Sequence, residues 1–394
     1  MTQSGASAPV VTSRPEPSRP GHGPLRAAAV LGLLYLFLVG VDGLGGGFRS
    51  LGEGALDSFF AATGNPFTAL MVGILATTLV QSSSVTTALI VGLVAAPLDP
   101  LPVANAVPMI MGANIGTTVT NTIASLAHMG RGEEFRRAFA VATVHDFFNY
   151  MTVVVLLPLE LLTGFLHRSA VVLGAALSGV GGARYESPIK EAIGAGGDLI
   201  EGMLETLVRV DPWVGLTYIA VSAVLIFTSL VGIVKIMRSS MQSTVESLVS
   251  RALAKNAVVA MIAGVVATVM VQSSSITTSL LVPLAGAGVL TLKQAFPVTL
   301  GANIGTTVTA LLAALAVSGE NASAGLTIAL VHLLFNLAGT LLVYPVRPIR
   351  AIPLYCAGRL ADVATESKRW AIIYVLCLFY GVPAIFAFLN QVLG

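Results

Sequence analysis

The chain has 394 residues, of which 55% are hydrophobic and only 10% are charged, and its formal net charge is +2. Because about 25% of the residues in soluble domains are charged, this composition excludes a water-soluble protein. The almost neutral charge gives no sign of the basic surface that a nucleic-acid partner requires. The two cysteines lack zinc-site or disulfide-framework spacing and no GxxxxGK[ST] loop is present, so we expect no cofactor and no ATP-driven step.

Apolar runs recur along the chain and approach the roughly 20 residues that a membrane-spanning helix needs. The clearest runs cover residues 27–41, 214–234, 326–344 and 370–389. They lack the alternating pattern of a transmembrane barrel, and lipid cannot satisfy unpaired backbone groups. The sequence therefore predicts an all-α polytopic membrane protein, which we expect in the inner (plasma) membrane.

Taken in chain order, the segments begin with a tail that is rich in Ser, Pro and Gly and is typical of disorder. The expected segments are a disordered cytoplasmic tail (1–24), a first transmembrane helix with an extracellular segment (25–64), repeat 1 (65–166), an extracellular linker (167–212), a transmembrane helix with a cytoplasmic segment (213–255), repeat 2 (256–346), a cytoplasmic loop (347–369) and a final transmembrane helix (370–394).

The two repeats are predicted from three motifs that occur twice in the same order. QSSSVTT at residues 81–87 returns as QSSSITT at 272–278, GANIGTTVT at 112–120 returns unchanged at 301–309, and HDFFN at 145–149 returns as HLLFN at 332–336. The distance between the copies changes by only a few residues from motif to motif. This regularity predicts one unit that is used twice.

Basic residues indicate how the two units are oriented. Most of the 21 Lys and Arg residues fall in four stretches that we place in the cytoplasm, namely 14–26, 131–137, 235–255 and 347–369. The more acidic stretch 168–210 is expected outside. Repeat 1 then starts from the outside and repeat 2 from the cytoplasm, so the repeats are inverted. Inverted repeats are typical of carriers whose site opens alternately to either side.

Each QSSS motif interrupts an apolar stretch, which predicts a helix that is broken inside a re-entrant hairpin. We call these residues the first serine block (Gln81, Ser82, Ser83, Ser84) and the second serine block (Gln272, Ser273, Ser274, Ser275). The N-terminus of the following helix and the hydroxyl donors favour an anion, while freed carbonyls could bind a hard cation. The alternative is that the serines only pack closely or bond back to their own helix; the repeated block makes it the less favoured interpretation.

The GANIGTTVT motif predicts either an unwound turn or a close helix contact, because glycine permits both. Asn114 and Asn303 supply amide groups to a bound anion in this interpretation. The hydroxyls come from the threonine pairs, which are Thr117, Thr118, Thr306 and Thr307. The alternative is plain packing of a GxxxG helix. We favour a functional role and a broken helix here, because the motif recurs beside each serine block.

The third motif lies on a helix, where His145 and Asn149 share a face. Such pairs are equally expected in ordinary interhelical hydrogen bonding. Asp146 differs, because Leu333 stands at its place in the second copy. A carboxylate in an apolar span is costly and predicts a functional site, with a cation as its partner. Since no Lys or Arg lies in the motifs, a bound anion would have to be neutralised by dipoles, hydroxyls and co-bound cations.

The stretch 108–160, with MGANIGTTVTNT and EFRRAFAVATVHDFFN, resembles the type II sodium-dependent phosphate cotransporters. Both serine blocks and the second GANIGTT also match, and the resemblance covers about residues 36–380. It implies sodium-driven phosphate uptake with the serine blocks as the substrate region. It also implies that Asp146 accompanies electrogenic transport, and that Thr306 and Thr309 fall where sodium ligands are expected.

These arguments lead to one set of expected ligands. For phosphate they are Gln81, Ser82, Ser83, Ser84, Asn114, Gln272, Ser273, Ser274, Ser275 and Asn303. For sodium they are Asp146, Thr117, Thr118, Asn149, Thr306, Thr307 and Thr309. Sodium is a co-substrate, lipid surrounds the protein, and a homodimer is left open.

Three other functions remain to be separated from this one. The first is a carrier for another small anion, such as sulfate or a carboxylate, or a carrier driven by protons. The second is an intramembrane enzyme that uses His145 and Asp146. It lacks a paired nucleophile, so we expect no enzymatic activity. The third is a channel, which saturable uptake would exclude.

Overall fold

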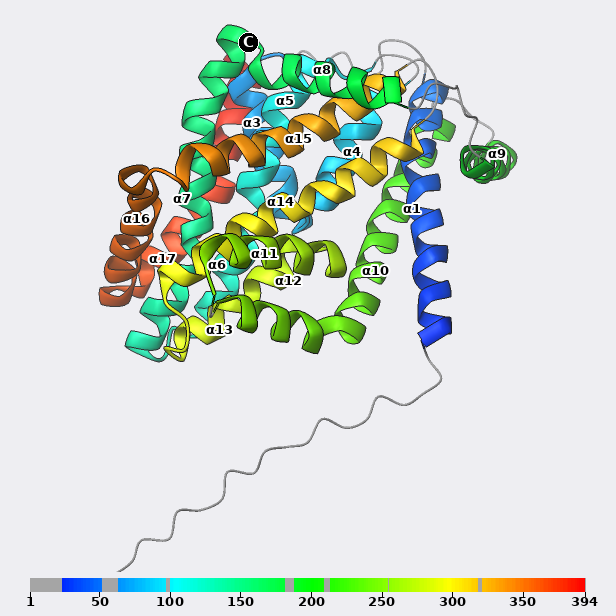
Figure 1. Ribbon diagram of the computed structural model, residues 1–394. Helices are drawn as coiled ribbons and strands as arrows, with labels where there is room; N and C mark the ends of the chain where they lie inside the picture. The colour runs from blue at the N-terminus through cyan, green and yellow to red at the C-terminus, as the bar shows by residue number, and fades with distance from the viewer. Residues whose placement is uncertain are drawn as a thin grey trace, which may run out of the picture.

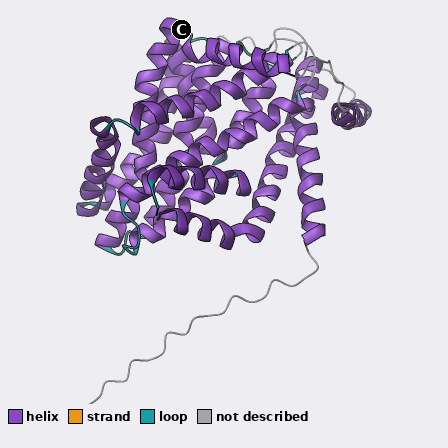
Figure 2. Ribbon diagram, viewed as in Figure 1, coloured by secondary structure: helices purple, strands orange, loops and turns teal. Residues whose placement is uncertain are grey.

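The computed structural model describes residues 23–51, 63–96, 100–180, 188–208, 213–253, 255–317 and 321–393. Helices dominate throughout these residues, and no strand occurs among them (Figure 2). The predicted tail over 1–24 lies outside the described residues, apart from Gly23 and Pro24, which begin the first helix. The prediction of an all-α polytopic membrane protein is confirmed.

Within the described residues, 6 helices are long and apolar enough to cross a membrane. They are Pro24–Gly47, Gly132–Thr163, Trp213–Leu253, Leu292–Ala316, Ala322–Val343 and Lys368–Leu389. Shorter apolar helices lie between them. Large apolar side chains of the long helices are exposed, such as Leu162 at 85% and Val224 at 58%. This surface suits lipid, and the protein is an integral membrane protein.

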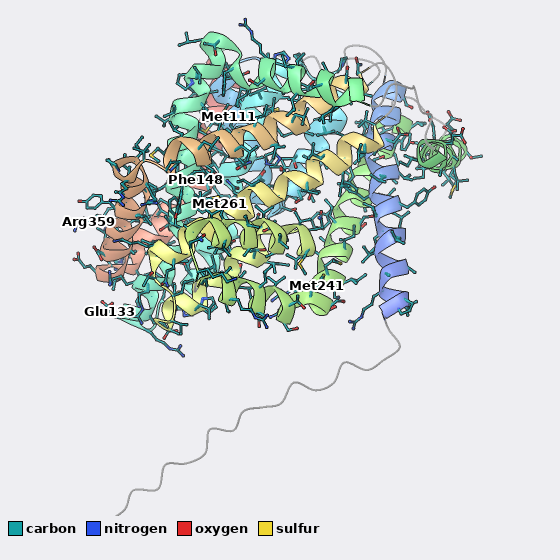
Figure 3. The ribbon with its side chains drawn as sticks, in the orientation of Figure 1. Met111, Glu133, Phe148, Met241, Met261 and Arg359 are labelled. Atoms are coloured by element: carbon teal, nitrogen blue, oxygen red, sulfur yellow. The ribbon has the colours of Figure 1, made fainter. Side chains whose placement is uncertain are left out.

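Two long helices form one wall of the molecule. α1 (Gly23–Leu51) and α10 (Trp213–Leu253) run side by side in Figure 1 and pack along much of their length. The start of α1 lies at the same lower end of the molecule as Glu133 and Met241 (Figure 3). The basic stretches near these residues therefore lie towards one end of the protein.

The first serine block lies between α3 (Pro66–Val80) and α4 (Ser83–Val94). Asn65 begins α3, because its side chain accepts the backbone N–H groups of Phe67 and Thr68. Gln81 ends the helix in the left-handed region, with φ 58°. The extended Ser82 then starts α4 by accepting the N–H of Val85 at 3.3 Å. The two helices contact each other and form a hairpin.

The second serine block repeats this geometry between α11 (Ala257–Val271) and α12 (Ser274–Ser279). Asn256 caps the start of α11, Gln272 is left-handed with φ 54°, and Ser273 accepts the N–H of Ile276 at 3.4 Å. Among the described residues, Gln81 and Gln272 are the only residues other than glycine that have a positive φ. A helix therefore ends at the same letter of both motifs, and the next one begins two residues later.

The GANIGTTVT motifs follow a different course from the expected one. In the first copy, α5 (Val103–Thr117) and α6 (Val119–Leu126) are separated only by Thr118, which keeps a right-handed helical conformation. In the second copy, α14 (Leu292–Ala316) runs through the motif without interruption. The prediction of a broken helix at this motif is wrong for the second repeat, and only a slight break marks the first.

Close helix packing explains why these glycines are required. A Cβ atom at Gly112 would lie 2.0 Å from the carbonyl oxygen of Leu70 in α3, and one at Gly301 would lie 1.9 Å from that of Met261 in α11. Both distances are far below van der Waals contact, so any side chain would push the helices apart. Each glycine thus lets the motif helix press against the hairpin of its own repeat.

The remaining helices complete both halves. They are α7 (Gly132–Thr163), α8 (Phe165–Val180), α9 (Pro188–Val208), α13 (Leu281–Gly286), α15 (Ala322–Val343), α16 (Arg347–Glu366), α17 (Lys368–Val375), a π-helical turn η1 (Leu376–Gly381) and α18 (Val382–Leu393). α7 and α15 carry the third motif. The expected linker 167–212 contains most of α8 and all of α9, and the expected loop 347–369 is largely the helix α16.

Candidate functional site

Both serine blocks line one cavity of about 630 Å³. Its third wall is a face of α10 that runs from Phe227 to Gln242. Ser83 and Ser274 are only 4% and 3% exposed, whereas Gln81 and Gln242 are exposed and connect the cavity with the surface. The fold therefore brings two distant copies of one motif to a single solvent-accessible place.

The glutamine of each block is held by a threonine of its own repeat. Thr120 donates its hydroxyl to Gln81 Oε1 at 3.0 Å, and Thr309 donates to Gln272 Oε1 at 3.2 Å. These two threonines are the last letters of the two GANIGTTVT copies. The hydroxyl of Ser84 also donates to Thr309 Oγ1 at 3.4 Å, which joins the two repeats directly.

Several serine hydroxyls of the blocks remain available to a ligand. Within the described residues, those of Ser83, Ser274 and Ser275 have no hydrogen-bond partner and border the cavity. Buried polar groups are normally paired, so unpaired donors at a cavity wall are typical of a ligand site. Ser82 and Ser273 are partly engaged, because their oxygens cap α4 and α12.

Four asparagines form a second, fully buried meeting point of the repeats. Asn303 donates to Asn149 Oδ1 at 3.0 Å, and Asn336 donates to Asn114 Oδ1 at 3.1 Å. Asn149 also donates to the backbone oxygen of Asn114 at 2.7 Å. We call these residues the asparagine cluster. Asn114 and Asn303, which the sequence places among the phosphate ligands, do not border the cavity that the serine blocks line.

Asp146 is fully buried on α7 and has a polar but uncharged environment. Its Oδ2 accepts the hydroxyl of Tyr374 at 2.7 Å and that of Thr122 at 3.3 Å. Thr118 lies beside the same carboxylate. The Oδ1 atom has no hydrogen-bond partner, and the carboxylate has no ion pair, among the residues that the structure describes. An oxygen with free lone pairs next to hydroxyl oxygens is a reasonable ligand set for a small hard cation.

The other expected sodium ligands form hydrogen bonds with different partners. Thr117 and Thr306 donate to the carbonyls of Ala113 and Ala302 in their own helices, at 2.8 and 3.1 Å. Thr118 and Thr307 likewise donate to the carbonyls of Ile115 and Ile304, both at 2.8 Å. Thr309 contacts the second serine block, and Asn149 belongs to the asparagine cluster. Of the expected sodium ligands, Thr118 therefore lies beside Asp146, whereas Thr309 and Asn149 are bonded to other groups.

Three functional candidates were missed by the sequence reasoning. Tyr374 contacts Asp146 from α17, far along the chain, and nothing in the motifs points to it. Lys235 and Arg238 of α10 border the cavity beside the serine blocks. The sequence places both residues only in a cytoplasmic basic stretch. The available signal was their spacing, since positions i and i+3 lie on one face of a helix.

A helical integral membrane protein with a cavity between two copies of one polar, broken-helix motif has the architecture of a membrane carrier. The profile of the Na+/Pi-cotransporter family matches residues 36–182 and 225–352. The chain therefore belongs to the Na+/Pi-cotransporter family, and the resemblance seen in the sequence is confirmed.

Individual relatives agree with this assignment. The chain is 34% identical to sodium-dependent phosphate transport protein 2A of Rattus norvegicus, with 92% of this chain and 67% of the relative covered. Protein 2A of Ovis aries is also 34% identical, with 94% and 70% covered. Protein 2B of Bos taurus is 32% identical, with 90% and 63% covered. No solved structure matches the chain.

Proposed function

We propose that the protein carries inorganic phosphate into the cell together with sodium ions, by alternating access to one site that both repeats share. The observation that carries this proposal is the meeting of the two serine blocks in one cavity. The names of the relatives support the same two substrates. Carriers, unlike enzymes, need no nucleophile or metal cluster at such a site, and the family membership favours transport over catalysis.

In this proposal phosphate lies between the hydroxyls of Ser83, Ser274 and Ser275. These donors suit an oxyanion because they add hydrogen bonds without adding negative charge. The N-terminus of α4 begins at Ser83 and contributes backbone N–H groups and the positive end of the helix dipole. Thr120 and Thr309 hold Gln81 and Gln272 in place, so the binding of a ligand to their amides would cost little further conformational entropy.

Sodium is proposed to bind at Asp146, where the unpaired Oδ1 atom offers a charged ligand. The hydroxyls of Thr118 and Thr122 supply neutral oxygens nearby. Thr309 offers a second point of contact for a cation next to the phosphate, because its hydroxyl connects Gln272 with Ser84. Transport would be electrogenic when the bound sodium ions carry more charge than the phosphate.

We place the end of the molecule that holds Glu133 and Met241 in the cytoplasm, following the positive-inside rule (Figure 3). The hairpin α3–α4 then enters from the outside and α11–α12 from the cytoplasm, both re-entrant. In support, α3 to α5 lie in the upper half of Figure 1 and α11 to α13 in the lower half. An axis in the membrane plane would exchange the two units. The membrane is the inner, or plasma, membrane.

Uptake of labelled phosphate into proteoliposomes tests the proposal. We expect saturable uptake that needs an inward sodium gradient, and that stops when choline replaces sodium or when the gradient is a proton gradient alone. Excess sulfate and a dicarboxylate serve as competitors and should leave the uptake unchanged. Sodium-independent uptake, or equal competition by sulfate, would overturn the assignment of the driving ion or of the cargo.

A further inference from the structure

One face of α10 changes from apolar to polar along the wall of the cavity. Phe227, Leu230, Val231 and Val234 present an apolar surface, and Lys235, Arg238, Ser239 and Gln242 continue the same face with polar groups. These positions are three or four residues apart, so they form one stripe on the helix. The cavity that both serine blocks border therefore has one wall whose polar part carries two cationic side chains.

The two cations have no negative partner. Lys235 and Arg238 form no ion pair within the part of the chain that the structure describes, and both are exposed. The one acidic residue in the sequence of α10, Glu246, is engaged by Gln242 at 2.9 Å and does not border the cavity. No acidic residue is found among the described residues that border it.

Three arginines near Glu133, towards the same end of the molecule, are engaged by protein groups. Arg131 pairs with Glu134 at 2.9 Å, and Arg136 pairs with Glu133 at 3.1 Å. Arg137 donates to the carbonyl oxygens of Ala285 and Gly286. Those arginines are occupied by protein groups, whereas Lys235 and Arg238 keep their donors free in a solvent-accessible space beside the serine hydroxyls.

We propose that Lys235 and Arg238 form a second anion subsite at the cytoplasmic mouth of the cavity, which receives the phosphate oxyanion as it leaves the serine blocks. This inference rests on the proposed function. The serine blocks carry no positive charge, so they hold phosphate well only while a sodium ion is near. Once sodium has left, the guanidinium fork and the ammonium group supply the missing positive charge and draw the anion towards the mouth.

The subsite makes a specific prediction about binding in the absence of sodium. Purified protein in an uncharged detergent, free of added lipid, is titrated with inorganic phosphate in choline buffer and followed by calorimetry. We expect the double variant Lys235→Gln/Arg238→Gln to bind phosphate roughly tenfold or more weakly than the wild type, because two charge-assisted interactions are lost. The affinity of the wild type should also fall steeply as choline chloride is raised, since exposed charges are screened by salt.

Two control variants keep the test specific. Arg251→Gln removes an exposed charge from α10 that does not border the cavity, and it should bind phosphate like the wild type. Lys235→Arg/Arg238→Lys exchanges the two cations and should retain most of the binding. Melting temperature and size-exclusion profile establish that each variant is folded. A failure of the proposed function would appear separately, as absent sodium-driven uptake by the wild type.

An anionic lipid headgroup offers the same phosphate chemistry as free phosphate. A parallel titration with micelles that contain phosphatidylglycerol separates the two sources. We expect the charge variant to lose affinity for free phosphate without lipid present, and phosphatidylglycerol to compete only weakly. Equal phosphate binding by the wild type and the double variant in lipid-free detergent would overturn the subsite. Loss of lipid binding alone would also overturn it and would assign the pair to the headgroup.

Discussion

The serine-lined cavity and the asparagine cluster are two regions where the repeats meet, and in both the repeated motifs contribute neutral polar side chains. In the cavity, three hydroxyls have no partner among the described residues and the space reaches the surface. In the cluster, each amide nitrogen donates to another amide or to a backbone carbonyl, and all four side chains are at most 2% exposed. Asn336 Oδ1 has no hydrogen-bond partner among the described residues.

The difference lies in how the hydrogen-bonding capacity is used. Polar groups that satisfy one another in a dry core fix the relative position of two segments. Polar groups that remain unpaired at a wetted wall cost little there and can bind a solute. We therefore interpret the asparagine cluster as the contact that fixes the two repeats against each other, and the cavity as the binding site. The sequence instead places Asn114 and Asn303 among the phosphate ligands and Asn149 among the sodium ligands.

The largest expected effect on stability comes from Asn303→Leu. This change leaves Asn149 Oδ1 without its donor in a buried position, which costs about 1–3 kcal/mol. The melting temperature should fall by several degrees, whereas Ser83→Ala should scarcely change it. Asn336→Leu is the matched variant, because it removes the donor to Asn114 Oδ1 in the same cluster, and it should behave similarly. If Asn303→Leu melted like the wild type but lost phosphate binding, Asn303 would be a ligand and the comparison would fail.

A large effect on transport, with stability preserved, is expected for Ser83→Ala and for Ser274→Ala. Each removes one donor to the phosphate oxyanion, a loss of about 1.5–3 kcal/mol or roughly 10- to 100-fold in affinity. The Michaelis constant for phosphate in proteoliposomes measures the change. Ser229→Ala is the control, because Ser229 is a buried serine of α10 that does not border the cavity. Unchanged kinetics in both cavity variants would remove the serine blocks from the site.

A change in coupling is expected for Asp146→Asn. Asn keeps the size and one acceptor oxygen but loses the charge that would balance a bound cation. The sodium dependence should weaken about tenfold or more, or transport should stop, and less net charge should move per phosphate. Glu160→Gln on the same helix is the control, because Glu160 accepts the N–H of Leu166 and so caps α8. Equal dependence on membrane potential in wild type and Asp146→Asn would make Asp146 a packing residue.

The smallest expected effect comes from Tyr374→Phe. It removes the hydroxyl that donates to Asp146 Oδ2 and leaves the ring in place. A hydrogen bond to a charged group contributes about 1.5–3 kcal/mol, but the Tyr374 hydroxyl bonds to the carboxylate both with and without sodium. Only part of that contribution therefore affects sodium binding, and the half-saturating sodium concentration should shift about 2- to 10-fold. Tyr355→Phe, at a site 68% exposed, should have no effect. A shift in phosphate affinity without any change for sodium would show that Tyr374 acts on the cavity instead.

The sequence predicted the parts of the fold that depend on local chemistry. The polar blocks in apolar stretches indicated helix ends at residues 81–84 and 272–275, and the capping serines lie there. The glycines of GANIGTTVT were ambiguous, because unwinding and close packing both require glycine. The close contact between Gly301 and α11 shows that close packing is the reason for the glycine in the second copy, and the sequence alone does not reveal this contact.

The composition of the site was harder to predict for the same reason. Tyr374 and Asp146 come from distant helices, and no repeat or spacing connects them. Lys235 and Arg238 have the pattern of an interfacial anchor, which basic residues at the end of an apolar span usually are. The sequence also could not separate asparagines that bind a ligand from asparagines that bind one another, since both are buried polar residues in a repeated motif.

The most direct test of the account is to locate the anion itself. Arsenate has the shape and charge of phosphate, and crystals grown with sodium and arsenate allow the arsenic atom to be found by anomalous diffraction. The account predicts one arsenic peak in the cavity, within hydrogen-bond distance of the hydroxyls of both Ser83 and Ser274. A peak beside the asparagine cluster, or one that contacts only a single serine block, would contradict the claim that the two repeats share one site.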